Sequence, residues 1–199
     1  MRVTGGRLGG RTLRVPRGDR VRPTSDRVRE SLFARLGDLS GCRVLDAFAG
    51  TGALGLEALS RGAEVAVFVE QAPAVLAVLR ANLDALVPEA DTRVMRGDAR
   101  SALRRLARGD ERFHHVFLDP PYGTALAAEV LPLAAALLAP GGQVLLETAR
   151  QDPLPSPSGL VILDDRRYGD TVITRWVAPD PAAAGARPGG HRQGDEGAS

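Results

Sequence analysis

The sequence contains no lysine, so all 26 of its basic residues are arginine. Its single cysteine, Cys42, excludes an internal disulfide and a cysteine-based metal cluster. No apolar run approaches the roughly 20 residues that cross a bilayer, and the N-terminus lacks the apolar segment of a signal peptide. The histidines show no spacing typical of metal ligands. We therefore expect a cytoplasmic protein that binds neither a membrane nor a metal ion.

The composition is that of one globular domain, with 44% hydrophobic and 25% charged residues among 199. Its charge is unevenly distributed. Nine arginines and three acidic residues lie within residues 1–30, so this segment carries +6 and the rest of the chain −4. A cationic arm on a mildly acidic body indicates a polyanionic partner, nucleic acid before membrane. The sequence leaves the oligomeric state open, and we expect a monomer.

Residues 2–15 alternate arginine with apolar or β-branched residues around two Gly-Gly pairs. This pattern predicts a β-hairpin with one basic face. Arginine suits phosphate groups because its planar guanidinium makes bidentate contacts. Thr24 or Ser25 is expected to cap a helix over 27–36. The candidate phosphate-contacting residues of this region are Arg2, Arg7, Arg11, Arg14, Arg22 and Arg27, with plain solvation as the alternative for Arg27.

From residue 43 onward, continuous apolar runs alternate with segments of helical periodicity. This alternation predicts a Rossmann-like, doubly wound α/β domain whose parallel strands are covered by helices on both faces. The last two strands are too close in sequence for a crossover and must pair antiparallel, which is typical of class I methyltransferases. The expected strands of this mainly parallel, seven-stranded sheet cover 43–48, 64–70, 92–97, 114–118, 143–147, 160–163 and 171–177, and the expected helices cover 53–61, 72–86, 99–107 and 126–138.

A glycine-rich turn follows the first of these strands, with the spacing Asp46-x-x-x-Gly50-x-Gly52-x-x-Gly55. Glycines let bare backbone N–H groups approach a ligand, so the turn fits a cofactor loop, although a tight structural turn is the alternative. Four expected strands end in an acid. Because the carboxyl ends of parallel strands meet at one edge of a sheet, these acids should gather there. They are Asp46, Glu70, Asp98 and Asp119.

This acidic rim favours one class of cofactor. Carboxylates accept hydrogen bonds from ribose hydroxyls and an adenine amine, and they attract a positive centre. S-adenosylmethionine has all three groups. A dinucleotide fits less well, because Asp46 would repel its pyrophosphate.

The motif Asp119-Pro120-Pro121-Tyr122 indicates the chemistry. Two successive prolines fix φ and remove N–H donors, which leaves the Pro120 carbonyl and the Asp119 carboxylate as two acceptors. An exocyclic NH2 of a nucleobase supplies two donors, and accepting both directs the nitrogen lone pair at a methyl group. Tyr122 is expected to stack on the base after it has swung out of its stack. The alternative is a rigid turn with a buried tyrosine.

The chain resembles the RsmD-type 16S ribosomal RNA guanine-N2 methyltransferases over about residues 2–177, on the motifs at 5–11, 22–33, 46–63, 119–122 and 168–171. The resemblance implies methyl transfer from S-adenosylmethionine to N2 of guanine 966 in the small ribosomal subunit, and RNA as the partner of the basic arm. By position, the cofactor loop would comprise Asp46, Phe48, Gly50 and Gly52; the ribose would be held by Glu70 and the adenine by Asp98 with Ala99; the target base would be handled by Asp119, Pro120 and Tyr122.

We expect three parts: a basic RNA-contacting extension over 1–40, a methyltransferase domain over 41–178, and a disordered tail over 179–199, which contains no Leu, Ile, Val or aromatic residue. Two other functions stay open. A DNA adenine-N6 or cytosine-N4 methyltransferase would need a target-reading domain, for which 199 residues leave no space. A non-catalytic nucleic-acid-binding module would not need the intact acids and the Asp-Pro-Pro-Tyr motif.

Overall fold

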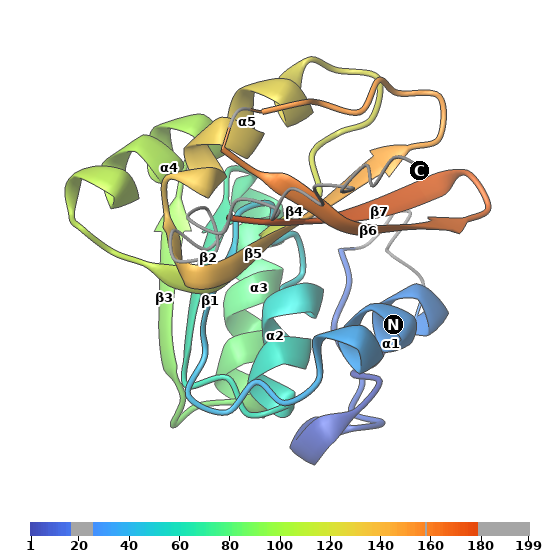
Figure 1. Cartoon of the computed structure of the whole chain (residues 1–199). Helices are drawn as coiled ribbons and strands as arrows, with labels where there is room; N and C mark the ends of the chain where they lie inside the picture. Colours follow the sequence, from blue (N-terminus) through green and yellow to red (C-terminus); the bar gives the residue numbers. More distant parts are fainter. Residues whose placement is uncertain (17–25, 158, 179–199) are drawn as a thin grey trace, which may run out of the picture.

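The structure of the chain is a computed structural model that describes residues 1–16, 26–157 and 159–178. Its centre is one seven-stranded sheet in the order β3-β2-β1-β4-β5-β7-β6 (Figure 1). The first five strands run parallel, and β7 pairs antiparallel with both β5 and β6. This confirms the predicted class I methyltransferase sheet. The strands are β1 (Arg43–Asp46), β2 (Val65–Glu70), β3 (Asp91–Arg96), β4 (Phe113–Leu118), β5 (Leu138–Ala149), β6 (Val161–Tyr168) and β7 (Thr171–Val177).

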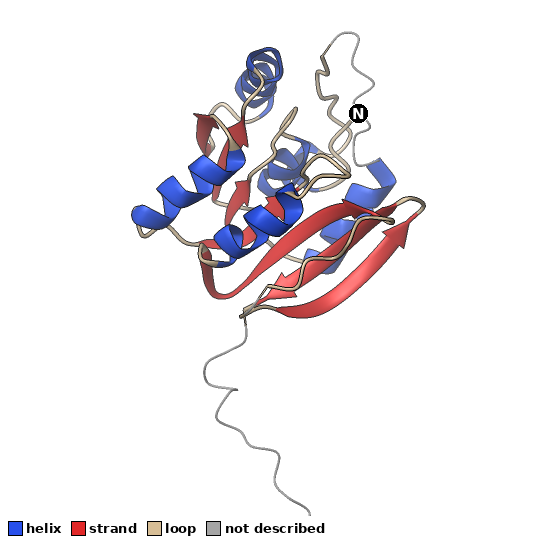
Figure 2. Cartoon of the chain, turned by 90° about the horizontal axis from the view of Figure 1, so that it is seen from above, coloured by secondary structure: helices blue, strands red, loops and turns tan. Residues whose placement is uncertain are grey.

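Helices cover both faces of the sheet, and each face has its own apolar core. On one face lie α1 (Asp26–Leu36), α2 (Ala53–Ser60) and α3 (Pro73–Leu86); on the other lie α4 (Ala99–Arg108) and α5 (Leu126–Ala135) (Figure 1). Seen from above, the long strands of the antiparallel part form one side of the molecule (Figure 2). None of the helices in the described ranges is long and apolar enough to span a bilayer.

The two regular strands of the predicted N-terminal β-hairpin are not formed, although the two halves of this segment pair antiparallel: the Val3 N–H donates to the Arg11 carbonyl at 2.9 Å and the Leu13 N–H to the Met1 carbonyl at 3.1 Å. Residues 1–16, the N-terminal arm, form a loop with one isolated bridge between Arg2 and Thr12 and a single 3₁₀ turn, η1 (Gly6–Leu8). The reason is tertiary contact with α2. Gly6 has φ +69°, and a Cβ there would lie 2.0 Å from the Ser60 carbonyl oxygen, so the glycine allows close docking rather than a strand turn.

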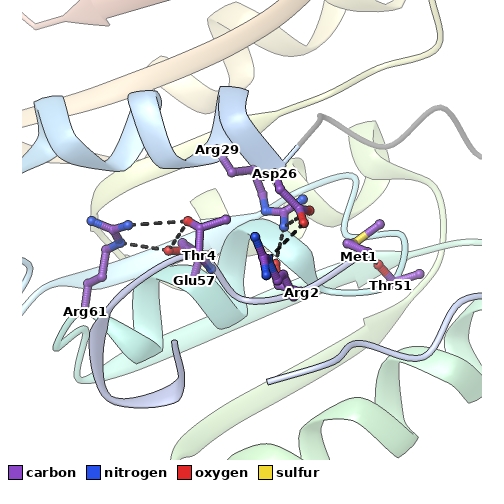
Figure 3. A network of polar contacts seen from close by, with 8 residues as sticks. All are labelled: Met1, Arg2, Thr4, Asp26, Arg29, Thr51, Glu57 and Arg61. Carbon is purple, nitrogen blue, oxygen red and sulfur yellow. Dashed lines mark hydrogen bonds and ion pairs between the residues drawn. The ribbon is translucent and has the colours of Figure 1, made fainter. Parts of the chain in front are cut away.

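Buried polar side chains hold the backbone of the arm. The carboxylate of Glu57 on α2 is fully buried and accepts hydrogen bonds from the Thr4 N–H and hydroxyl, both at 2.7 Å, and from Arg61 at 2.9 Å (Figure 3). The Ser60 hydroxyl accepts from the Leu8 N–H at 2.8 Å. Arg29 of α1 is fully buried and donates to the Arg2 carbonyl and to Asp26 (Figure 3). The arm is therefore an integral part of the fold.

Other differences are local. The helix expected over 126–138 ends at Ala135, because 138–142 joins β5 instead of stopping a helix, and β6 extends to Tyr168. The proposed caps Thr24 and Ser25, the candidate contact Arg22 and the tail over 179–199 lie outside the described residues.

Candidate active site

A cavity of about 360 Å³ lies at the carboxyl ends of the parallel strands. There β1 has β2 on one side and β4 on the other, so the strand order reverses at this point and leaves a crevice. Apolar side chains, among them Val69 and Leu126, contribute to the walls. Seven of the ten predicted cofactor and catalytic residues line this cavity: Phe48, Glu70, Asp98, Ala99, Asp119, Pro120 and Tyr122.

The other three, Asp46, Gly50 and Gly52, do not line the cavity. They belong to the end of β1 and the glycine-rich turn that follows it. Asp46 is 1% exposed and accepts the Gly55 N–H at 3.0 Å, near the start of α2. Burial raises the pKa of Asp46 to about 7, and the neighbouring charge of Glu70 acts in the same direction. At Gly52, where φ is +86°, a Cβ would lie 2.5 Å from Cδ1 of Leu79. Direct cofactor contact by these three residues stays a prediction.

Glu70 and Asp98 are held in place by the backbone. One oxygen of Glu70 accepts the Gly50 N–H at 2.9 Å and the other accepts the Ala72 N–H at 2.7 Å, which fixes the carboxylate at the end of β2. Asp98 accepts the Ser101 N–H at 3.2 Å and so caps α4. Hydrogen bonding to Arg100 lowers the pKa of Asp98. Both carboxylates thus border the cavity in fixed orientations.

Asp119 comes directly after β4, and its surroundings disfavour its charged form. Burial raises the pKa of Asp119 well above the usual range, and the charges of Glu147 and Asp46 raise it further. The charge of Asp46 thus acts on Asp119, as expected for two acids at the same edge of the sheet. A carboxyl group with such a raised pKa in a cavity is a candidate for proton chemistry.

Sequence reasoning did not assign a role to Glu147. The Tyr122 hydroxyl donates to Oε1 of Glu147 at 2.5 Å and lies 3.2 Å from Oγ1 of Thr171 on β7. Burial raises the pKa of Tyr122, and the hydrogen bond to Glu147 adds to this effect. One signal was present in the sequence: Glu147 ends the expected strand 143–147, as the four recognised acids end theirs.

A family model described as Conserved hypothetical protein 95 matches residues 1–177 of this chain. The chain belongs to this RsmD-like family. The Ribosomal RNA small subunit methyltransferase D of Escherichia coli K12 is 39% identical over 159 residues, which cover 78% of each chain. The protein of the same name from Haemophilus influenzae is 33% identical over 172 residues, 85% of this chain and 89% of that one. The solved structure of the E. coli protein yhhF has a TM-score of 0.78 and 36% identity, covering 89% and 97% of the two chains.

The arginines predicted to contact nucleic acid in this family member lie mainly on the exposed side of the arm. Val3, Leu8 and Leu13 are buried, whereas the arginines between them are exposed. Arg7 lies beside the carboxyl end of α2, where the adjacent Leu8 is bound by Ser60. Arg14 lies near the glycine-rich turn after β1, since Asn82 binds both the Arg14 backbone and the Thr51 carbonyl. The exposed set is Arg2, Arg7, Arg11, Arg14 and, on α1, Arg27.

Proposed function

We propose that the protein is an S-adenosylmethionine-dependent methyltransferase that modifies the exocyclic N2 amine of a guanine in 16S ribosomal RNA of the small subunit. The observation that carries the proposal is that Asp119 and Pro120 border the same cavity as Glu70 and Asp98. This brings a candidate amine-binding pair next to a candidate cofactor-binding pair. Relatives of this chain bear the name Ribosomal RNA small subunit methyltransferase D.

The cavity lining suits the cofactor. Glu70 offers carboxylate oxygens to ribose hydroxyls, and Asp98 with the Ala99 backbone offers polar atoms to adenine. Phe48 and Val69 add apolar wall for the adenine ring. When bound, the cofactor supplies a methyl group on a positively charged sulfur, which the nearby carboxylates attract.

In the proposed reaction, the Asp119 carboxylate and the Pro120 carbonyl each accept one N–H of the amine. This orients the nitrogen lone pair and stabilises the positive charge that develops on nitrogen. The methylated nitrogen then loses a proton, and Asp119, with its raised pKa, is suited to take it up. Tyr122 stacks on the base while its hydroxyl is held by Glu147.

By family membership we propose guanine 966 as the target. We also propose residues 1–40 as the RNA-contacting extension of a methyltransferase domain over 41–178, acting as a monomer. The exposed arginines of the arm provide the charge for the phosphates.

The test is transfer of labelled methyl from S-adenosylmethionine to small subunits that lack the modification, with naked 16S rRNA in parallel, followed by nucleoside identification. The expected product is N2-methylguanosine at position 966. Label on adenosine N6 or cytidine N4, with DNA as the better substrate, would favour a DNA amino-methyltransferase. RNA binding without any label would favour a non-catalytic binding module.

A further inference from the structure

Glu147 lies beside Asp119 at the edge of the sheet. In the parallel pairing of β4 and β5, Leu118 is the partner of Leu146. Asp119 comes directly after Leu118 and Glu147 directly after Leu146, and the charge of Glu147 raises the pKa of Asp119. Glu147 is 7% exposed, which makes it a buried acid next to the proposed amine-binding carboxylate.

A second cavity of about 230 Å³ borders the same loop. Pro120, Pro121 and Tyr122 line both this cavity and the cofactor cavity, whereas Glu147 lines only the second. The Asp-Pro-Pro-Tyr loop thus forms a wall shared by two hollows, with Asp119 on one and Glu147 on the other. Because Tyr122 lines both cavities and its hydroxyl contacts Glu147, a base held between Asp119 and Tyr122 can present its remaining edge to Glu147.

Guanine differs from the other amino bases on this edge. Its ring nitrogen N1, next to the N2 amine, carries a hydrogen and donates. The ring nitrogen next to the amine of adenine or cytosine has a lone pair and accepts. A carboxylate only accepts when ionised, and it can accept about four hydrogen bonds over its two oxygens. It therefore stabilises the N1–H of guanine and repels the lone pair of the other bases.

We propose that Glu147 is the residue that selects guanine: its carboxylate accepts a hydrogen bond from N1–H while Asp119 and Pro120 hold the N2 amine. The inference rests on the proposed function and adds to it the reason for base choice. The Tyr122 hydroxyl, donating to Oε1 of Glu147, keeps the carboxylate oriented. Selection by a buried acceptor is strong because the wrong base leaves that acceptor facing another lone pair.

The test compares small subunits reconstituted with guanosine or with 2-aminopurine riboside at the target position. Both bases carry the N2 amine, but N1 of 2-aminopurine accepts instead of donating. Wild-type protein should methylate guanosine on the order of 100-fold faster, as expected for loss of a charge-assisted hydrogen bond. Glu147→Gln should reduce this ratio to below about tenfold, because an amide can donate to N1. Tyr122→Phe, which keeps the carboxylate but loses the hydrogen bond that orients it, should lower the ratio less than Glu147→Gln does.

An unchanged ratio in Glu147→Gln, in a variant that still binds S-adenosylhomocysteine by calorimetry, would overturn the proposal. Should that variant fail to fold, Glu147→Asp decides: its shorter side chain withdraws the acceptor, so the preference for guanosine should fall, and an unchanged preference would count against Glu147. Failure of the proposed function is distinguished by the wild-type protein, which would then methylate neither substrate.

Discussion

The cavity rim and the N-terminal arm both bury carboxylates, but in opposite surroundings. At the rim, Asp119 lies among the charges of Glu147 and Asp46, and its pKa is raised. Beside the arm, Glu57 is paired with Arg61 and accepts from Thr4, so its charge is balanced within the chain. A buried acid whose charge and hydrogen bonds are matched by its neighbours stabilises the fold. Buried acids that repel one another instead favour binding of a ligand that brings hydrogen-bond donors and positive charge.

Removing the central acid of the rim gives the largest expected effect. Asp119→Ala should lower the rate of methyl transfer about 1,000-fold, because the amine loses an acceptor that acts on developing charge. S-adenosylhomocysteine affinity should change less than about threefold, since uniform cofactor contacts remain. Single-turnover kinetics and calorimetry measure the two quantities. Asp91→Ala, at the exposed start of β3, is the control, and equal turnover in Asp119→Ala would show that Asp119 does not act on the amine.

Removing the buried acid of α2 that binds the arm, Glu57, should affect stability instead. Glu57→Ala leaves the Thr4 N–H and Arg61 without their acceptor, which should lower the free energy of unfolding by about 3 kcal/mol. Urea denaturation measures this. Glu64→Ala, an exposed neighbour, should stay within about 0.5 kcal/mol of wild type. A loss at Glu57 no larger than this control would mean that the arm is not held as the structure indicates.

The pH dependence of stability sharpens the same contrast. The pKa of Asp46 is raised to about 7, so the folded state binds its proton more tightly than the unfolded state. The stabilisation of the fold that comes from this tighter proton binding is complete below about pH 4 and is lost as the pH rises toward 7. Asp46→Asn removes this loss, so the variant should gain stability relative to wild type by at most about 1.4 kcal/mol per pH unit across that window.

Denaturant titrations at several pH values give the difference between the two proteins. His115, whose burial lowers its pKa to about 4, acts in the opposite direction, but equally in both proteins, so it cancels in the difference. A difference that does not change between pH 4 and 7 would show that Asp46 stays ionised in the fold.

The exposed arginines of the arm should give the smallest effect. Replacing Arg7, Arg11 and Arg14 by Gln should weaken RNA binding and reduce its salt dependence by about one unit of slope for each lost phosphate contact. The matched control replaces Arg104, Arg105 and Arg108, three exposed arginines on α4. The same reduction in both triple variants would mean that the arm carries no special part of the RNA interface.

The sequence predicted the rim far better than the arm. Parallel strands are unbroken apolar runs whose ends meet, so the positions of Glu70, Asp98 and Asp119 follow from local pattern alone. The docking of the arm depends on Ser60 and Glu57, more than 50 residues away, which look like ordinary helix positions. From the sequence alone, the Gly5-Gly6 pair predicts only a hairpin turn and not the close contact of Gly6 with Ser60. The role of Glu147 depends on the register of β5 against β4, which a single sequence does not specify.

Asn82 joins the two regions through one side chain. Its amide accepts the Arg14 N–H at 2.8 Å and donates to the Arg14 carbonyl at 3.1 Å and to the Thr51 carbonyl, between Gly50 and Gly52, at 2.9 Å. The same side chain therefore holds both the arm and the glycine-rich turn after β1. Under the proposed function, this shared side chain couples two binding events. RNA bound to the arm raises the affinity of the turn for the methyl donor, and a bound donor raises the affinity of the arm for RNA by the same factor.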